Sequence, residues 1–249
     1  MSDYDRKLFD RIAVDYGAKD RRAANRLARR LRLEQTLKAA RIGDAGDLLE
    51  VGCGAGFTAR YLAGRYRRYL GVDHSAELVA IAMAENGSPT ARFSARAAQT
   101  LPQDARFDTI VMIGVLHHVD DDAGLLRHLA GLLRPGGWLL ANEPQSANPL
   151  IQLSRHVRKR VDAAYSVEQR YYTAGELAGL WRQTGLADVK VVPQGLFSTP
   201  FAEVLLPDLA PVGWAASLAC AFDRGLEATI PRLLKPLSWN LIAAGRKAG

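Results

Sequence analysis

Residues 48–62 read LLEVGCGAGFTARYL, an apolar run followed by glycines at positions 52, 54 and 56 and then by helix-forming residues. A loop that leaves the carboxyl end of a parallel strand lies at the edge where open α/β sheets bind their ligands. Glycine suits such a loop because it has no side chain to block a ligand and because it tolerates positive φ. The stretch therefore predicts a strand, a cofactor-binding loop and a helix.

The glycine spacing and two acidic residues distinguish among the cofactors that such a loop binds. The dinucleotide pattern G-x-G-x-x-G requires a third glycine at the position of Phe57. Glu50 lies two residues before the first glycine, where a carboxylate repels a pyrophosphate and attracts the ammonium group of S-adenosylmethionine (SAM). Asp73 ends the run YLGVD and is placed to accept hydrogen bonds from both ribose hydroxyls of either NAD or SAM. The spacing and Glu50 therefore favour SAM over NAD.

Short apolar runs alternate with helix-like segments, the pattern of a doubly wound, mostly parallel sheet with helices on both faces. The runs are LLEV (48–51), YLGVD (69–73), ARFSA (91–95), DTIVMIG (108–114) and WLLANE (138–143), with the turn RPGG (134–137) just before the last. VKVVP (189–193) and WNLIAAGR (239–246) predict two further strands. Residues 1–16 and 20–40 predict two helices, and Thr173 with Glu176 predicts a capping box that opens a helix ended by Gly185.

The combination E-x-G-x-G-x-G, an acid ending the second strand, FDTIVM in the fourth, LHHV after it and LRPGG before the fifth resembles the class I SAM-dependent methyltransferases. The small-molecule branch related to ubiquinone-biosynthesis enzymes matches best. The resemblance implies a Rossmann-like sheet of seven strands whose last strand is antiparallel. It also implies one domain over residues 1–249, with N-terminal helices (1–42), a SAM-binding core (45–143) and cap or substrate segments (144–172 and 196–237).

The resemblance implies a set of cofactor-binding residues. The loop positions that it places around the methionine portion of SAM are Glu50, Gly52, Cys53, Gly54 and Gly56. Asp73 would bind the ribose and His74 would lie against the adenine. Tyr16 matches an aromatic residue that closes over SAM, although a core tyrosine on a helix face explains it equally well. Family members often carry an acid where this chain has Ala97, so adenine recognition is expected to rest on the backbone near Ala98 and on Gln99.

Two adjacent histidines after the fourth strand are the candidate catalytic residues. Histidine suits proton abstraction at neutral pH, and His117 and His118 follow a strand end that faces the methyl donor in this fold. Glu143, at the end of the fifth strand, is expected to orient one of them, and register favours His118. The alternative is that one histidine only holds its loop. A metal site with the acids at 120–122 is disfavoured, because adjacent side chains on an extended backbone point to opposite faces and these acids suit a helix start.

The charge pattern leaves the partner open. The net charge is +7, and arginines at 21, 22, 26, 29, 30 and 32 supply much of the excess. They indicate either an anionic partner or a solvated helix face. A second basic run (155–160) and Tyr171 with Tyr172 would flank an acceptor pocket or serve only as surface and support. The apolar segment 196–237 suggests a cap, a homodimer surface or a peripheral membrane contact. Its longest continuous apolar stretch is too short to span a bilayer.

The sequence thus predicts a SAM-dependent methyltransferase acting on a small, hydrophobic acceptor that is anionic or lipid-like, with O-methylation by a histidine base favoured. C-methylation of an isoprenoid or quinone-like lipid is the alternative. A nucleic-acid methyltransferase is disfavoured, because GVLH stands where such enzymes carry an N-P-P-Y type motif. A SAM-binding scaffold without catalysis remains a third class. Two distant cysteines and a charged N-terminal stretch without an apolar region predict a cytoplasmic protein with neither disulfides nor a signal peptide.

Overall fold

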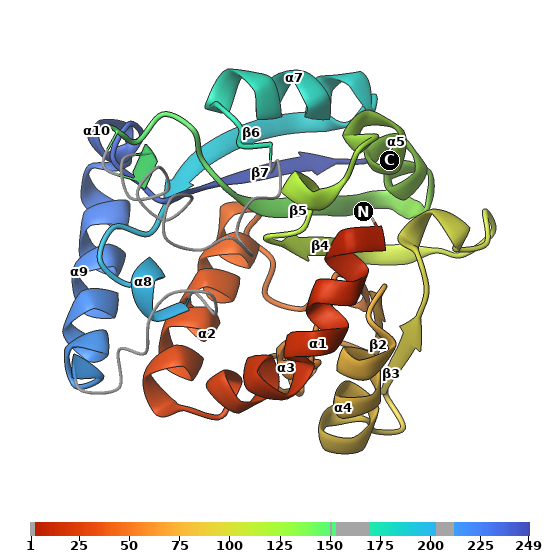
Figure 1. Cartoon of the computed structure of the whole chain (residues 1–249). Coiled ribbons are helices and arrows are strands. Elements are labelled where there is room, and N and C mark those ends of the chain that lie inside the picture. The colour runs from red at the N-terminus through yellow and green to blue at the C-terminus, as the bar shows by residue number, and fades with distance from the viewer. Residues whose placement is uncertain (1–2, 150, 153–169, 203–211) are drawn as a thin grey trace.

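Seven strands form one mixed sheet in the computed structural model, which describes residues 3–149, 151–152, 170–202 and 212–249 (Figure 1). The strands are β1 (Asp47–Val51), β2 (Arg68–Asp73), β3 (Ala91–Ala95), β4 (Phe107–Ile113), β5 (Leu133–Pro144), β6 (Ala187–Gln194) and β7 (Asn240–Arg246). Their order is β3-β2-β1-β4-β5-β7-β6, and β7 runs antiparallel to both of its neighbours. The predicted fold class is confirmed, including the antiparallel last strand.

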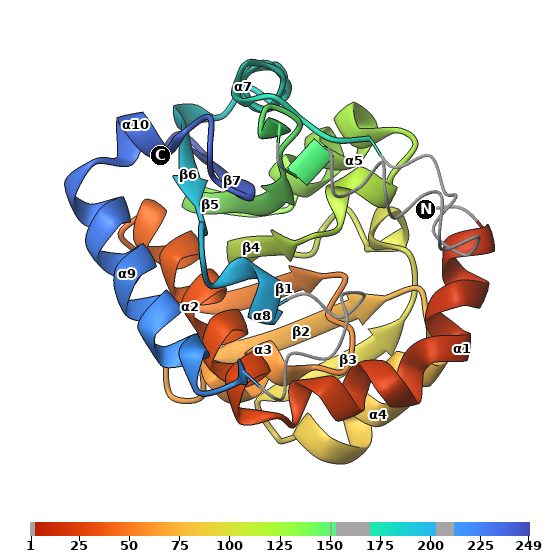
Figure 2. The same ribbon diagram turned by 60° about the vertical axis from the view of Figure 1, so that its left-hand side comes forward.

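Helices cover both faces of the sheet (Figures 1 and 2). They are α1 (Asp3–Asp20), α2 (Ala23–Ala39), α3 (Phe57–Tyr61), α4 (Ala76–Asn86), α5 (Asp122–Gly131), α7 (Ala174–Gln183), α8 (Thr199–Ala202), α9 (Ala215–Thr229) and α10 (Pro231–Leu234). Strand β1 shows how the layers arise from sequence. Leu48 packs in a core with α2, α3 and α4, whereas the next residue, Leu49, packs in a core with α5 and α7. A strand buried on both faces needs this continuous apolar run.

The predicted capping box is present at the start of α7. Thr173 accepts a hydrogen bond from the Glu176 N–H (3.2 Å), and the Glu176 carboxylate accepts one from the Thr173 N–H (2.7 Å). Gly185 follows the helix with φ of 75°, so the predicted stop is also confirmed. The break predicted at 134–137 is only partly right. β5 already pairs with β4 at Leu133, and the register shifts between Phe107 and Thr109 as the chain passes Gly136, so the turn is an irregularity inside the strand.

The interpretation of the α2 arginines as a solvated helix face is wrong for two of them. Arg29 donates to the buried Asp20 (2.5 Å) and lies 4.9 Å from the centre of the Tyr16 ring. Arg32 donates to the Asn142 side chain (2.9 Å) and to its carbonyl oxygen (3.2 Å). A guanidinium can be half-buried when carboxylate, carbonyl and aromatic partners replace its water. These two arginines therefore dock α2 against α1 and β5.

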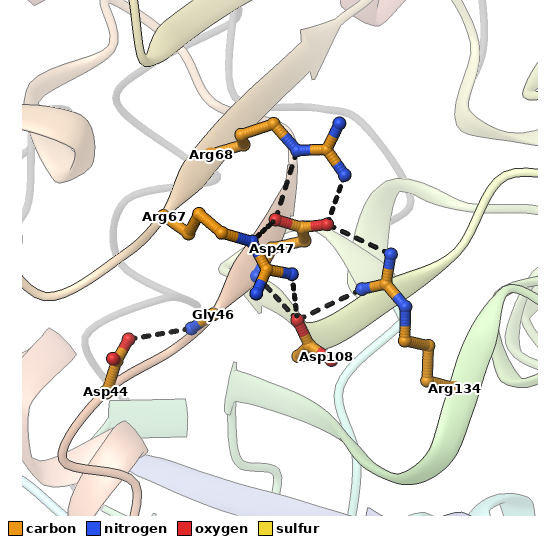
Figure 3. Close-up of polar contacts among 7 residues, drawn as sticks. All are labelled: Asp44, Gly46, Asp47, Arg67, Arg68, Asp108 and Arg134. Carbon is orange, nitrogen blue, oxygen red and sulfur yellow. Dashed lines mark hydrogen bonds and ion pairs between the residues drawn. The ribbon is translucent and has the colours of Figure 1, made fainter.

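The amino ends of the central strands are joined by an ion-pair cluster (Figure 3). Asp47, which begins β1, accepts hydrogen bonds from Arg67 (2.9 Å), Arg68 (3.1 Å) and Arg134 (3.0 Å). Asp108 accepts from Arg67 (3.2 Å), from Arg134 (3.0 Å) and from the Asp47 N–H (2.8 Å). The cluster ties β1, β2, β4 and β5 together at the edge where these strands begin.

Helices α8, α9 and α10 lie on the α2 side of the molecule, with α9 alongside α2 (Figures 1 and 2). Small residues of α9 make this packing close: Cys220 is buried with Ala28 and Leu31 of α2. Within the described residues, no helix combines the length and the apolar character needed to cross a membrane.

Candidate active site

One cavity of about 710 Å³, its open mouth included, lies at the carboxyl ends of β1, β2 and β4. Its wall includes most of the residues predicted to bind the cofactor. The predicted residues on the wall are Tyr16, Gly52, Gly54, Asp73, His74, Ala98, Gln99 and His118. Three of the other predicted residues, Glu50, Cys53 and Gly56, do not line it. The cavity thus lies where the glycine loop, the end of β2 and the turn after β3 meet.

Asp73 is held at the edge of the cavity by the backbone. It is 9% exposed, and its two carboxylate oxygens accept hydrogen bonds from the N–H groups of Gly54 (2.8 Å) and Ser75 (3.0 Å). Burial raises the pKa of this carboxyl above its usual value, and the two backbone bonds oppose that rise. Because both oxygens are fixed, the side chain is pre-oriented as a bidentate acceptor on the cavity wall.

Glu50 lies beneath the loop and not on the cavity wall. It is 3% exposed and accepts hydrogen bonds from the Thr58 hydroxyl (2.8 Å) and the Tyr69 hydroxyl. Burial raises the pKa of Glu50 to about 8, although the two hydroxyls lower it in part. The side chain therefore connects the end of β1 with α3 and β2. Thr58 and Tyr69 are supporting residues that the motif did not reveal, because nothing in their spacing marks them.

Two residues of the glycine motif serve packing. Gly56 precedes α3 as its N-cap with φ of 79°, and a Cβ there would lie 2.7 Å from the Phe93 ring and 2.9 Å from Ala82. Cys53 is 7% exposed and belongs to the core between the sheet and α2. Gly52 lines the cavity and also permits a close approach in the core, because a Cβ there would lie 2.3 Å from Val115. The first and third glycines thus let two parts of the core approach the loop.

Helix α1 forms one side of the cavity through Phe9 and Tyr16. The Tyr16 ring lies against Gly54, 3.4 Å from the position that a Cβ would take, and Phe9 contacts His118 edge-on with centroids 5.5 Å apart. Asp10 accepts a hydrogen bond from the Ser75 hydroxyl (2.6 Å), which fixes α1 at the end of β2. Tyr16 therefore combines the two interpretations of the sequence, since it packs against α2 through Arg29 and also lines the cavity.

Glu143 pairs with His117, and the prediction that it pairs with His118 is wrong. The His117 Nδ1 lies 2.7 Å from the fully buried Glu143 carboxylate. The same carboxylate accepts hydrogen bonds from the N–H groups of Val115 (3.0 Å) and Leu116 (2.9 Å). Burial raises the pKa of Glu143, but the His117 ring and these N–H groups outweigh it and hold the pKa below its usual value. Glu143 is therefore an anionic anchor of the turn as well as a partner of His117.

The local backbone explains this correction. Residues Leu116–His118 form a short 3-10 helix, not the extended chain that the sequence suggested. Neighbouring side chains of such a turn diverge by much less than those of a strand. The two imidazole rings accordingly lie side by side, with centroids 4.1 Å apart, and only His118 lines the cavity.

The two tyrosines before α7 have different roles. Tyr172 is fully buried, and its hydroxyl lies 3.1 Å from Asp122 and 3.2 Å from the Leu116 carbonyl oxygen, so it supports the histidine turn. Tyr171 stacks on His117 with centroids 6.3 Å apart. The basic run at 155–160 lies outside the described residues.

Arg32 is a site residue that sequence reasoning missed. Its guanidinium lies 3.6 Å from the position of a Cβ on Gly114, a cavity residue, and His117 Cε1 lies 3.8 Å from the same position. The cation therefore stands near His117 at the end of β4. Arg32 was not predicted because it is one of six arginines in this part of the sequence, which does not show which of them faces inward.

A metal centre is not formed by the described residues, in which no group of three or more His, Cys, Asp or Glu side chains is arranged to hold an ion. The acids after the histidines begin α5, as expected. Asp121 caps the helix by accepting a hydrogen bond from the Gly124 N–H (2.8 Å), and Asp122 pairs with Arg170 (2.8 Å).

The sheet order, the glycine loop at the end of β1 and the acid at the end of β2 define a Rossmann-like α/β enzyme whose cavity takes a nucleoside-containing cofactor. A family model described as a methyltransferase domain matches residues 18–191. The chain belongs to this family and carries its methyltransferase domain.

Three known proteins that the chain resembles are each less than 30% identical to it. The ubiquinone biosynthesis O-methyltransferase of Leptothrix cholodnii is 28% identical over 152 residues, which cover 57% of this chain and 65% of that enzyme, less than two thirds of its length. A probable SAM-dependent methyltransferase of Mycolicibacterium smegmatis is 27% identical over 183 residues, covering 67% of this chain and 71% of that protein. A solved SAM-dependent methyltransferase of Thermotoga maritima superposes with a TM-score of 0.64 at 21% identity, covering 97% and 99% of the two chains, and shares the fold.

Proposed function

We propose that this methyltransferase transfers the methyl group of SAM to a hydroxyl oxygen of a small, hydrophobic acceptor, with His117 as the general base. The observation that carries the proposal is the 2.7 Å contact between His117 Nδ1 and Glu143 beside Gly114 at the cavity. The similarity to a ubiquinone biosynthesis O-methyltransferase supports an oxygen acceptor. His118, which lines the cavity, is proposed to contact the cofactor instead.

The cavity fits SAM through groups that the chain already holds in place. Asp73, fixed by two backbone N–H groups, is proposed to accept the ribose hydroxyls, and Gly52 and Gly54 leave room for the methionine portion. His74, Ala98 and Gln99 are proposed to surround the adenine. Glu50 is proposed to act from below, by fixing α3 and the loop.

The proposed chemistry asks little of the protein beyond alignment and proton removal. SAM supplies a methyl group on a sulfonium, which needs no electrophilic activation. His117 would take the hydroxyl proton on Nε2 as the oxygen becomes nucleophilic, while Nδ1–H donates to Glu143. Because the pKa of Glu143 is held below its usual value, its carboxylate remains charged and stabilises the imidazolium that forms. Holding the acceptor in line contributes the larger part of the rate.

Two substitutions test the proposal. His117→Ala and Glu143→Gln should each lower kcat by roughly 10²–10⁴-fold, the usual contribution of a general base, and leave the Kd of SAM within about threefold. Formation of S-adenosylhomocysteine from a panel of phenols, catechols and hydroquinones measures the first quantity, and calorimetric titration with SAM measures the second.

A matched control is His128→Ala, which removes a histidine of α5 that is hydrogen-bonded to Gln103 and does not line the cavity. It should retain wild-type kcat. Full activity of both His117→Ala and Glu143→Gln would remove the base from the proposal. A loss of SAM binding in either variant would instead assign the pair to the cofactor site.

A further inference from the structure

The solvent side of α9 is apolar. Trp214, Leu218 and Phe222 follow one another at intervals of four residues, so they project from one side of the helix, and they are 73%, 56% and 60% exposed. In the described residues, eight of the ten exposed large apolar side chains lie between 197 and 237. Such a concentration in one segment of the chain differs from the scattered apolar residues of an ordinary surface.

α9 reverses the usual arrangement of a surface helix, because small and acidic residues face the protein and large apolar residues face the solvent. Ala216, Ala219 and Cys220 are buried, and Cys220 packs with residues of α2 and α8. Asp223 is fully buried and accepts hydrogen bonds from the N–H groups of Leu196 (3.1 Å), Phe197 (3.0 Å) and Ser198 (2.9 Å). Leu218 and Phe222 thus take little part in the packing of α9, and folding does not account for their presence.

The two acidic residues of α9 position a neighbouring loop that adds a further apolar side chain to this surface. Glu227 accepts a hydrogen bond from the Gly195 N–H (2.6 Å), so Asp223 and Glu227 together hold the loop that leads from β6 into α8. The held loop presents Phe197, which is 55% exposed and contacts Phe222 edge-on with centroids 6.3 Å apart. On the side of α10, Leu233 and Leu237 are 70% and 49% exposed. We call the set Phe197, Trp214, Leu218 and Phe222 the α9 face.

Positive charge borders the α9 face along α2, which lies beside α9 in both views (Figures 1 and 2). Arg26 and Arg30 are exposed and one turn apart on α2, and Arg224 of α9 reaches the same flank, since Glu34 contacts both Arg30 (2.9 Å) and Arg224 (3.6 Å). Both acids of α9 are bound to the loop. The edge of the face is therefore cationic, in a chain whose net charge is +7.

We propose that the α9 face docks on an anionic lipid bilayer. A helix with Trp, Phe and Leu on one side and Arg beside it lies in the plane of the bilayer, with its apolar residues at the boundary between headgroups and acyl chains. Arginines that flank such a face attract anionic headgroups. A second copy of the chain fits less well, because a two-fold contact through this face brings the Arg26, Arg30 and Arg224 edges of both copies together. The inference is independent of the acceptor proposed above.

Flotation with lipid vesicles tests this docking. The full chain should float with vesicles of phosphatidylcholine mixed with phosphatidylglycerol, and bind pure phosphatidylcholine weakly. Trp214→Ala/Phe222→Ala should reduce partitioning by roughly tenfold or more, because each removes a side chain that inserts among the lipids. Arg26→Gln/Arg30→Gln should reduce binding to the anionic vesicles and flatten its dependence on salt.

Matched controls isolate the face. Met83→Ser removes an apolar side chain of α4 that is 59% exposed, and Arg92→Gln/Arg182→Gln removes two exposed charges elsewhere; both should bind vesicles as the wild type does. Circular dichroism and SAM titration verify that each variant is folded. Wild-type protein that stays unbound with anionic vesicles overturns the proposal, as does unchanged binding of Trp214→Ala/Phe222→Ala. A dimer in light scattering that this double variant abolishes, without vesicle binding, assigns the face to a second copy and also overturns it.

Discussion

Asp47 and Glu50 stand three residues apart on β1 and are 2% and 3% exposed, and yet their carboxyl groups are held in opposite ways. At the amino end, Asp47 accepts hydrogen bonds from three arginines, which hold its pKa well below the usual range even though burial opposes them. At the carboxyl end, Glu50 is bonded to two hydroxyls only, and burial raises its pKa to about 8.

This difference follows from what each end of the sheet does. The amino end lies away from the cavity, and its charges are compensated among themselves and serve to join four strands (Figure 3). The carboxyl end must leave room for a cofactor, so Glu50 and Asp73 are paired with hydroxyl and N–H groups in place of cations. The ion pairs at the amino end therefore stabilise the sheet. At the carboxyl end, acid groups without a cationic partner are tolerated, because that end forms the cofactor cavity.

The largest expected effect is an opposite dependence of stability on pH at the two ends. The folded protein retains a proton on Glu50 up to about pH 8, whereas the unfolded chain releases it near pH 4.5. Wild-type stability relative to Glu50→Gln should therefore fall as the pH rises from about 5 to 8, by about 1 kcal/mol per pH unit and about 3 kcal/mol in all. Urea unfolding at a series of pH values measures this difference, and a flat difference would contradict the assignment.

The second effect is a loss of stability at the amino end. Asp47→Asn leaves Arg67, Arg68 and Arg134 without their shared carboxylate and should reduce the free energy of unfolding by about 2 kcal/mol at neutral pH, a value kept low because Arg67 and Arg68 are mostly exposed. The stabilisation by Asp47 should disappear as the pH falls below about 4, the reverse of the Glu50 effect. Arg92→Gln, which removes an exposed arginine on β3, should change stability by less than about 0.5 kcal/mol.

The sequence predicted the carboxyl end far better than the amino end, for a physical reason. The glycine loop, Asp73 and the strand alternation are local patterns, and six of the seven strands were predicted within two residues of their observed bounds, whereas β5 begins five residues earlier than predicted. The Asp47 cluster depends on register between strands: Asp47 lies opposite Arg68 only once β1 and β2 are paired. No local pattern shows such a pairing.

The same reasoning explains the errors at the site. The inward turn of Arg29 and Arg32 depends on partners, Asp20 and Asn142, that come from other elements. The choice between His117 and His118 depended on the backbone after β4, and the Glu143 carboxylate, from the neighbouring strand, holds that backbone in a turn. Residue types were thus predictable, whereas the direction of each side chain was set by contacts distant in sequence.

The smallest expected effect separates cofactor binding from stability. Asp73→Asn keeps the size of the side chain but removes its charge and one of its two acceptor oxygens, so the Kd of SAM should rise roughly tenfold, about 1.4 kcal/mol. Calorimetric titration measures it beside Asp47→Asn, which should leave the Kd within about twofold because the amino end is remote from the cavity. Equal losses of affinity in the two variants would show that SAM binding reports general stability, and the contrast between the two ends of the sheet would then fail.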